Sequence, residues 1–381
     1  MKSGMKKRIT ILGATGSIGT NTIEVVRANP DDFEIVGLAS FRDVAGLRLL
    51  SNEFPKARLA LGGYENTFEG IDIAGSDAAV RLVQQTEADL VVNGISGAAG
   101  FLPSLASLES GADLALANKE TIVMAWEIIS FEADKNSCKI LPVDSEHSAI
   151  FHLVSAHGIL DVDEIILTAS GGPFRTWSSE QIASVTLSDA LAHPTWNMGG
   201  KITVDSASLA NKGLEVIEAV KLFGIHPDKV KVLIHPQSRV HSLVRLRDGS
   251  MYAQISQPDM RIPIHNALFW PECHKNPFGF LDLADSELTF EKPREDLFPM
   301  LRLAYEAIEQ GALYPNAYNA ANEIAVSAFM NGSICFTDIP RITAAVLEKD
   351  WTGKIDTVET VLDGDGRARR EAARVITEVV V

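Results

Sequence analysis

The sequence predicts three parts: an α/β Rossmann-like N-terminal domain, an α+β central domain and a C-terminal helical bundle. Three observations support this division. Short apolar runs alternate with helical stretches up to about residue 145, as in a doubly wound parallel sheet. Apolar runs then follow one another without helices between them, and beyond residue 295 apolar residues recur at helical spacing. We place the parts at 1–145, 146–269 and 296–381, with a proline- and glycine-containing linker at 270–295.

The N-terminal part begins with a strand, a helix and a second strand within its first 40 residues, which is a βαβ unit. Further short apolar runs extend the same alternation. The predicted strands are Arg8–Leu12, Glu34–Leu38, Asp89–Val92, Asp113–Leu116 and Lys139–Val143, and the predicted helices are Ile18–Arg27 and Thr121–Ala133.

The central part contains strands joined without helices, and Asp248-Gly249 is a hairpin turn between two of them. Its sheet is therefore at least partly antiparallel, and an open edge would suit pairing of two copies into a homodimer. The predicted strands are Glu164–Thr168, Val230–Ile234, Val240–Leu246 and Met251–Ile255. The predicted C-terminal helices cover Leu297–Ile308, Ala321–Ala328, a segment opening at Asp338, and Arg367–Val381.

Composition excludes several classes of protein. The 381 residues include 34 basic and 50 acidic ones, so the net charge is 34 − 50 = −16, which disfavours nucleic acid and anionic membranes as partners. The three cysteines, Cys138, Cys273 and Cys335, lie far apart and outside metal-binding spacings, which indicates a reducing compartment and predicts a cytoplasmic protein. We find neither a signal peptide nor an apolar run long enough to span a membrane.

A glycine-rich loop follows the first predicted strand. Gly13, Gly16 and Gly19 are spaced at threes and open the next helix, where backbone N–H groups bind a pyrophosphate. The alternative is a tight turn from strand to helix. After the second strand, Arg42 is not preceded by the carboxylate that holds an NAD ribose, which favours NADP. Arg42 can equally be a solvated loop residue, and the neighbouring Asp43 argues against NADP.

Two acidic segments indicate a divalent metal site. If the strand Lys139–Val143 continues as extended chain, Asp144 and Glu146 point to the same side. Hard oxygen ligands of this kind suit Mg²⁺ or Mn²⁺, although such a pair is more often solvated surface. Glu215 is the better third ligand. For Glu218, on the same face of the predicted helix, we prefer an ordinary polar surface position.

Small polar residues and one lysine are concentrated nearby in the sequence, a composition that suits a phosphate monoester. Ser170 can alternatively belong to a turn, and Ser206 can be a helix cap. The segment from His193 to Lys201 combines a bulky aromatic residue with glycines, which is typical of a mobile lid. The candidate phosphate ligands are Ser170, Ser206, Asn211 and Lys212.

Nine motifs spread over nearly the whole chain resemble those of the 1-deoxy-D-xylulose 5-phosphate reductoisomerase family. They occur in family order, and together they are far more specific than any one of them. They are GATGSIG at 13–19, ANKE at 117–120, PVDSEH at 142–147, ASGGPF at 169–174, HPTWNMG at 193–199, KITVDSA at 201–207, NKGLE at 211–215, HPQS at 235–238 and NAANE at 319–323.

The resemblance implies NADPH and one divalent cation per subunit, Mg²⁺ or Mn²⁺, as cofactors, in a homodimer whose central domain is catalytic. It implies metal ligands at Asp144, Glu146 and Glu215, and catalytic roles for Lys119, Glu146, His193 and Glu215. The implied substrate positions are Lys119, Ser145, Glu146, Ser170, His193, Trp196, Ser206, Asn211, Lys212 and Glu215, with Met198 in the lid. The implied cofactor positions are Thr15, Gly16, Ser17, Ile18, Arg42, Asn118, Glu120 and Gly199.

The chemistry implied by the resemblance is a metal-dependent rearrangement of 1-deoxy-D-xylulose 5-phosphate, followed by reduction with NADPH to 2-C-methyl-D-erythritol 4-phosphate, in the non-mevalonate isoprenoid pathway. The chain departs from the family pattern at Phe41-Arg42-Asp43, so the cofactor contacts there are an open point. Two other functions would use the same glycine loop. One is an NADP-dependent dehydrogenase of another phosphorylated substrate, which would not need the carboxylates, and the other is a non-catalytic NADP sensor.

Overall fold

The computed structural model describes residues 6–66, 68–196 and 198–379, and its contacts divide the chain into two compact units. The first unit comprises Met1–Thr121, Ile129–Ser148 and Asp259–Gly279, and the second comprises Ile122–Ile128, Ala149–Pro258 and Phe280–Val381. The boundaries expected near residues 145, 269 and 295 stay a prediction.

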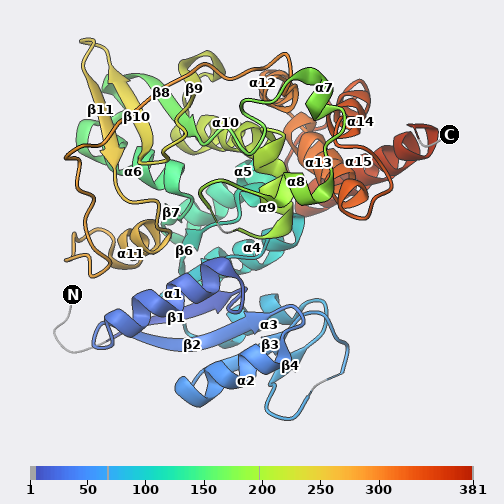
Figure 1. Cartoon of the computed structure of the whole chain (residues 1–381). Coiled ribbons are helices and arrows are strands. Elements are labelled where there is room, and N and C mark those ends of the chain that lie inside the picture. Colours follow the sequence, from blue (N-terminus) through green and yellow to red (C-terminus); the bar gives the residue numbers. More distant parts are fainter. Residues whose placement is uncertain (1–5, 67, 197, 380–381) are drawn as a thin grey trace. The chain divides into compact units, whose positions relative to one another are not determined.

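The first unit is built on a seven-stranded parallel sheet in the order β4-β3-β2-β1-β5-β6-β7 (Figure 1). Strand β1 lies between β2 and β5, so the direction in which strands are added reverses at β1, and the crevice beyond the carboxyl ends of such strands is where ligands bind. The strands are β1 (Lys7–Leu12), β2 (Phe33–Ser40), β3 (Arg58–Leu61), β4 (Ile73–Ala74), β5 (Leu90–Asn93), β6 (Asp113–Leu116) and β7 (Ile140–Pro142).

The helices of the first unit follow the strands in the alternation that the sequence predicts, and they confirm its α/β class. Between residues 44 and 109 the sequence predicted β5 but missed the other short elements, because apolar runs there are brief and glycines are frequent. The helices are α1 (Ser17–Ala28), α2 (Val44–Glu53), α3 (Ala78–Gln85), α4 (Phe101–Glu109), α5 (Lys119–Asn136) and α11 (Arg261–Phe269). Helix α5 is kinked at Ala125, and its middle turns belong to the second unit.

The second unit contains a four-stranded sheet in the order β11-β10-β8-β9. Strand β10 is antiparallel to both β11 and β8, whereas β8 and β9 are parallel, so the expected mixed sheet is confirmed. Gly249 has a φ of +89° in the hairpin, and the Asp248 carboxylate accepts a hydrogen bond from the Ser250 amide at 2.8 Å, as the Asp-Gly pair predicts. The strands are β8 (Val162–Ala169), β9 (Val230–Ile234), β10 (Val240–Leu246) and β11 (Met251–Ile255).

Helices pack with this sheet around a single apolar cluster that also includes the C-terminal residues. Helix α13 contacts α12, α14, α15 and α9, so the C-terminal helices share a core with the elements that carry the polar motifs. Whether those helices form a separate domain stays a prediction. The helices are α6 (Ser145–His157), whose first turn belongs to the first unit, α7 (Ser179–Ile182), α8 (Leu187–Leu191), α9 (Gly200–Ala207), α10 (Ala210–Phe223), α12 (Met300–Gln310), α13 (Tyr314–Met330), α14 (Asp338–Leu347) and α15 (Val358–Val379).

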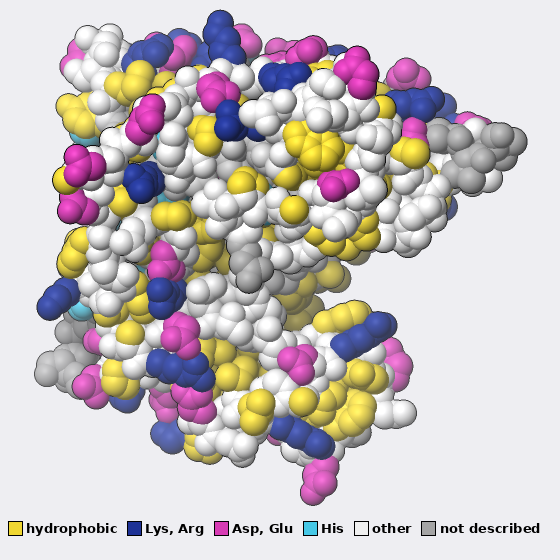
Figure 2. Space-filling view, viewed as in Figure 1, with side chains coloured by type: hydrophobic (Ala, Val, Ile, Leu, Met, Phe, Trp, Pro, Cys, Tyr) yellow, Lys and Arg dark blue, Asp and Glu magenta, His cyan; other side chains and the backbone are white. Residues whose placement is uncertain are grey.

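Several helix starts differ from those expected, and α12 begins at Met300 rather than at Leu297. Helix α13 begins at Tyr314 and α15 at Val358, because the polar turns before the regular apolar spacing are also helical. Acidic and basic side chains are interspersed over the face of the molecule shown in Figure 2. Among the described residues, the model contains no helix with both the length and the apolar character needed to cross a membrane.

Candidate functional site

The loop between β1 and α1 lies at the carboxyl end of the strand where the sheet order reverses. Gly13 has a φ of +81°, and a Cβ placed on Gly19 would lie 2.3 Å from the Gly13 carbonyl oxygen and 2.5 Å from the Ala14 Cα. Only glycine therefore fits at position 19. Gly16 is the N-cap of α1 and has no side chain to bond the first-turn N–H groups, which suits this helix end for an anion. The strand, loop and helix predicted from the glycine spacing are confirmed.

The segment after β2 organises its charged residues by local contacts. The Asp43 carboxylate is the N-cap of α2 and accepts a hydrogen bond from the Gly46 amide at 2.8 Å. Arg42 is exposed, and its guanidinium carbon lies 4.9 Å from the ring centroid of the exposed Phe41. Thr15 of the glycine loop is joined to Ser40 by a 2.8 Å hydrogen bond between hydroxyls. Asp43 thus caps the start of α2, while Arg42 presents positive charge just beyond the carboxyl end of β2.

The segment after β6 joins two loops at the carboxyl edge of the same sheet. Asn118 caps α5 by accepting from the Thr121 amide at 2.9 Å, and its own amide donates to the carbonyls of Ile95 and Gly97 at 2.7 and 2.8 Å. Its amide also donates to the Glu120 carboxylate at 3.0 Å. The side chains of the predicted cofactor residues Asn118 and Glu120 are both buried, and Asn118 orders the loop that follows β5.

The sequence analysis assumed an extended chain from Asp144 to Glu146. This assumption is wrong, because the segment Asp144–His147 is not extended. Helix α6 begins at Ser145 directly after β7, and the Ser148 amide donates to the Asp144 carbonyl at 2.8 Å. Asp144 and Glu146 therefore lie at the first turn of a helix, because a polar start followed by an apolar stretch from Ala149 favours a helix over a continued strand.

Hydrogen bonds fix the carboxylates of this turn. The buried Lys119 ammonium pairs with the Asp144 carboxylate. The Ser145 hydroxyl donates to the Glu146 carboxylate at 2.6 Å, so this serine orients one of the predicted metal ligands. The predicted residues Lys119, Asp144, Ser145 and Glu146 thus occur together at the carboxyl ends of β6 and β7.

In the second unit, Ser170 and His193 meet beyond the end of β8. The Ser170 hydroxyl lies 3.0 Å from His193 Nε2, and it accepts a hydrogen bond from the Gly172 amide at 3.2 Å. His193 Nδ1 accepts from the amides of Thr195 and Trp196 at 3.1 and 2.9 Å. An imidazole whose Nδ1 is an acceptor carries its proton on Nε2, and partial burial lowers the pKa of His193 below its usual value. The ring is therefore neutral and donates to Ser170.

Helices α9 and α10 carry the next group of predicted residues. Ser206 lies near the carboxyl end of α9, so the interpretation of Ser206 as an N-cap is wrong. A Cβ on Gly172 would lie 2.8 Å from the Ser206 carbonyl oxygen, which places the loop 170–172 directly against this end of α9. Leu209, with a φ of +61°, then turns the chain into α10. This arrangement brings Ser170 and Ser206 to the same part of the second unit.

The first turns of α10 hold a buried carboxylate between two donors. The Asn211 amide donates to Glu215 at 2.5 Å, and the Lys212 ammonium contacts both the Glu215 carboxylate and the carbonyl of Thr168 in β8. Lys212 and Glu215 are buried, and so is Glu218. The expectation of an ordinary polar surface for Glu218 is wrong, because α10 carries apolar residues around most of its circumference and is itself a core helix.

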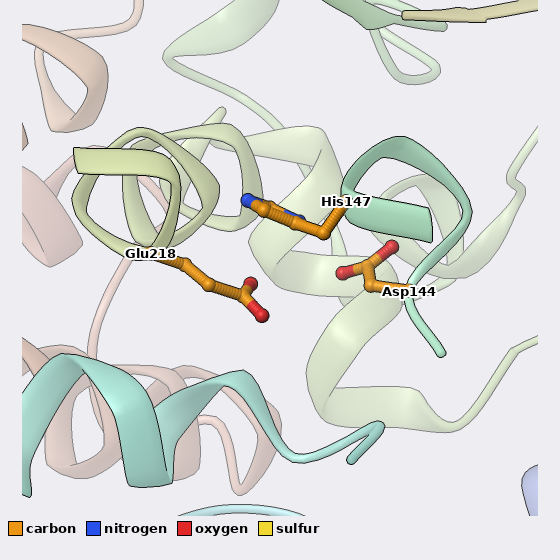
Figure 3. Close-up of side chains that lie close together, drawn as sticks. All are labelled: Asp144, His147 and Glu218. Carbon is orange, nitrogen blue, oxygen red and sulfur yellow. The ribbon is translucent and has the colours of Figure 1, made fainter. Parts of the chain in front are cut away.

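Two sets of side chains present ligand atoms for a metal ion, and both include Asp144. One set is Asp144, Glu146 and Glu215, and the other is Asp144, His147 and Glu218, whose side chains converge in Figure 3. Within each set the ligand atoms lie within 4.8 Å of one another. The first set has only carboxylate oxygens, which Mg²⁺ and Mn²⁺ prefer, whereas the imidazole of the second suits Zn²⁺ and other transition metals. Sequence interpretation did not select His147 or Glu218 as ligands.

The predicted lid lies between α8 and α9. The Trp196 ring centroid is 6.4 Å from that of His241, and the exposed Gly199 is the N-cap of α9. Met198 is half-buried, and Asn197 of the same motif lies outside the described residues. The hydrogen bonds from the amides of Thr195 and Trp196 to His193 fold the start of this segment into a tight turn.

The fold and the site define an α/β protein that combines a glycine-rich nucleotide loop with carboxylates arranged for a divalent cation. Three protein-family models match successive parts of the chain. The 1-deoxy-D-xylulose 5-phosphate reductoisomerase model matches residues 9–126, that family's C-terminal domain matches 140–223, and the DXP reductoisomerase C-terminal domain matches 255–371. The chain belongs to the 1-deoxy-D-xylulose 5-phosphate reductoisomerase family.

Relatives of that name cover nearly the full chain. The Treponema denticola protein is 48% identical over 376 residues, or 98% of each chain, and the Chlorobaculum tepidum protein is 45% identical over 97% of this chain and 100% of its own. The Zymomonas mobilis enzyme in complex with NADPH superposes with a TM-score of 0.90 at 38% identity, covering 98% of this chain and 99% of its own. A DOX-P reductoisomerase in complex with NADPH, fosmidomycin and magnesium has a TM-score of 0.91 at 36% identity, with the same coverage.

Proposed function

We propose that this protein converts 1-deoxy-D-xylulose 5-phosphate into 2-C-methyl-D-erythritol 4-phosphate, with NADPH as reductant and a divalent cation as cofactor. Family membership supports the reaction. The observation that carries the proposal is the set of three carboxylates, Asp144, Glu146 and Glu215, in a chain that also has a dinucleotide loop. An ordinary dehydrogenase has no use for that set, whereas a metal-assisted rearrangement needs it.

The carboxylate set suits Mg²⁺ or Mn²⁺ in its ligand chemistry. Ser145 holds Glu146, Asn211 and Lys212 hold Glu215, and Lys119 holds Asp144, so each ligand has a second partner that orients it. When bound, such a cation is a Lewis acid that stabilises negative charge on substrate oxygens. The protein's part is to hold three oxygen ligands in place and to leave room for the substrate.

Two variants distinguish the two possible ligand sets. Glu215→Gln should weaken Mg²⁺ binding, measured by calorimetry, by about tenfold or more and should reduce turnover, because a charged ligand is replaced by a neutral one. Glu218→Gln is the matched control, since it changes the same group one turn further along α10. If Glu218→Gln weakens Mg²⁺ binding and Glu215→Gln does not, the set containing His147 is the cation site.

The remaining polar residues are assigned to the two organic ligands. Ser170, Ser206, Asn211 and Lys212 would bind the substrate phosphate, and the neutral His193 would donate a hydrogen bond from Nε2. Lys119, Ser145 and Trp196 would lie along the substrate, with Lys119 and His193 in catalytic roles beside Glu146 and Glu215. The proposed cofactor residues are Thr15, Gly16, Ser17, Ile18, Arg42, Asn118, Glu120 and Gly199, of which the first four form the start of α1 and its loop.

The direct test follows NADPH absorbance with the purified protein and 1-deoxy-D-xylulose 5-phosphate, with and without Mg²⁺ or Mn²⁺. We expect oxidation of NADPH that requires the cation. Oxidation of the same rate after metal removal would refute the role of the carboxylates. Cofactor binding without oxidation would refute the substrate and leave a different reductase or a sensor.

We further propose that two copies form a homodimer through β11. This strand ends the sheet of the second unit, and its Met251, Tyr252 and Ile255 side chains are exposed. An apolar edge strand of this kind favours pairing with another chain. Sedimentation equilibrium should give twice the chain mass of 41.2 kDa, and a monomer mass would refute the proposal.

A reducing compartment, and hence the cytoplasm, suits the three free cysteines, and cell fractionation tests this localisation.

A further inference from the structure

A buried carboxylate next to Ser206 is held by the C-terminal helices. Asp205 is 1% exposed, and its two oxygens have different partners. The Lys201 ammonium lies 2.9 Å from Oδ2 within α9, and the Asn322 amide of α13 donates to Oδ1 at 2.8 Å. The contact with Asn322 spans 117 positions of the sequence and is the hydrogen bond by which α13 reaches this carboxylate.

The end of α9 beyond Asp205 is connected by short hydrogen-bonded steps to the start of α10. The Ser208 hydroxyl donates to the Asp205 carbonyl at 3.2 Å, and the Leu209 amide donates to the Ser206 carbonyl at 3.3 Å. The loop carrying Ser170 also packs against Ser206. A displacement of Asp205 would therefore move Ser206 and the residues around it.

Helix α13 also contacts the start of α10 from the same face. Tyr318 lies four residues before Asn322, one helical turn away, and a Cβ on Gly213 would lie 2.5 Å from the Tyr318 hydroxyl oxygen. Gly213 directly follows Lys212, so the contact with α13 fixes the position of the helix turn that carries this lysine. One face of α13 thus supports both Ser206 and Lys212.

We propose that Asn322 is a positioning residue for the phosphate site: by holding the Asp205 carboxylate, it fixes the end of α9 that presents Ser206. The inference rests on the proposed function for the identity of the phosphate. Asn322 itself touches neither the phosphate nor the reacting atoms and acts only through Asp205.

Stability alone does not explain an asparagine at this position. Asn322 is fully buried, and no described residue donates to its Oδ1. A buried amide oxygen without a donor is unfavourable, so an apolar residue would serve the core better. The amide donor to Asp205 is the contact that favours asparagine.

The neighbouring Asn319 provides a matched control. It is equally buried and lies on the same helix, but its amide donates to Glu323 at 3.1 Å within α13 and, among the described residues, to no group of α9. Asn319→Ala therefore removes the same group from the same core without affecting Asp205. A general loosening of α13 would appear in both variants.

The experiment measures the dissociation constant of inorganic phosphate by ³¹P NMR titration, together with KM and kcat for 1-deoxy-D-xylulose 5-phosphate. For Asn322→Ala we expect both the phosphate dissociation constant and KM to rise by about tenfold, with kcat within about twofold of wild type. Asn319→Ala should leave all three constants unchanged. Thermal denaturation of each variant checks folding, and Asn322→Ser, which leaves a smaller void, replaces Asn322→Ala if the latter does not fold.

Each outcome decides the inference. Unchanged phosphate affinity in a folded Asn322 variant would overturn it, as would an equal loss in Asn319→Ala, or a wild-type protein that binds no phosphate. Phosphate affinity that depends on Asn322 in a protein inactive on 1-deoxy-D-xylulose 5-phosphate would support the positioning role while refuting the proposed function.

Discussion

Replacement of Arg42 by alanine should weaken NADPH binding and leave NADH binding almost unchanged. The two cofactors differ only by the phosphate on the ribose 2′ oxygen, and positive charge after the second strand is where that phosphate is recognised. Arg42 is exposed and lies two residues after Ser40, whose hydroxyl bonds Thr15 of the glycine loop, and its side chain lies over the Phe41 ring. Asp43, which would oppose the phosphate by charge, is turned toward α2 as its cap.

The expected magnitude follows from these contacts. A hydrogen bond to a charged group is worth about 1.5–3 kcal/mol, and 1.4 kcal/mol is a factor of ten in affinity. Since Arg42 is exposed and screened by solvent, the lower end applies, which corresponds to about tenfold. Loss of the Phe41 contact should change the ratio of NADPH to NADH affinity only slightly. An exposed cation over an aromatic ring contributes about 0.5–1 kcal/mol, and its loss would affect the binding of both cofactors equally.

The assay is titration of NADPH and NADH, followed by nucleotide fluorescence, at two salt concentrations. Asp43→Asn is the control, because asparagine also caps helices and only the negative charge is removed. We expect Asp43→Asn to improve NADPH binding slightly and Arg42→Ala to weaken it in a salt-dependent way. Equal losses for NADPH and NADH in Arg42→Ala would show that Arg42 does not recognise the 2′-phosphate.

Three further predictions concern other parts of the site. Gly19→Ala should destabilise the protein by about 1–3 kcal/mol and weaken NADPH binding, because its Cβ meets backbone at 2.3 Å; Gly16→Ala, with 3.3 Å, should cost much less in a denaturant titration. The pKa of His193 in the folded protein is below the unfolded value of 6.5. The contribution of His193 to stability is therefore complete above pH 6.5 and is lost as the pH falls toward the folded pKa. A His193→Asn variant should lack this pH dependence in thermal denaturation. Lys212→Met should raise KM and lower stability by about 3–5 kcal/mol, since it leaves Glu215 buried with one partner fewer, and an unchanged KM would remove Lys212 from the phosphate site.

Most strand positions were predictable because each of these strands is a short apolar run with a polar or glycine boundary, whereas the short strands β3 and β4 were missed. The bounds of β9, β10 and β11 coincide with those expected, and the Asp248-Gly249 turn explains why two of them pair. Helix starts were less predictable. The turn from β7 into α6 was interpreted as a strand because Asp144 and Glu146 lie on either side of Ser145. Two carboxylates at this spacing are too few to distinguish a strand from the first turn of a helix.

The burial of Glu218 could have been inferred from α10 itself. Leu214, Val216 and Ile217 lie on different sides of that helix, so a helix with such a sequence is surrounded by protein and its acidic residues are buried with it. Buried carboxylates require a partner, which is a stronger reason to look for a ligand than their spacing on one face. Spacing placed Glu215 and Glu218 on one helix face, and a polar surface position was preferred for Glu218 because the sequence showed no partner for it.

Contacts between distant segments are a different matter, because no local pattern encodes them. Asn322 and Asp205 occur in two motifs, NAANE and KITVDSA, that the sequence analysis could identify, but it connected neither residue to any chemistry. Their hydrogen bond depends on how α13 packs against α9, which is set by apolar residues of the shared core. Spacing along the chain therefore identifies candidate ligand-binding residues, whereas residues that hold those candidates in place become visible only when the packing of the helices is known.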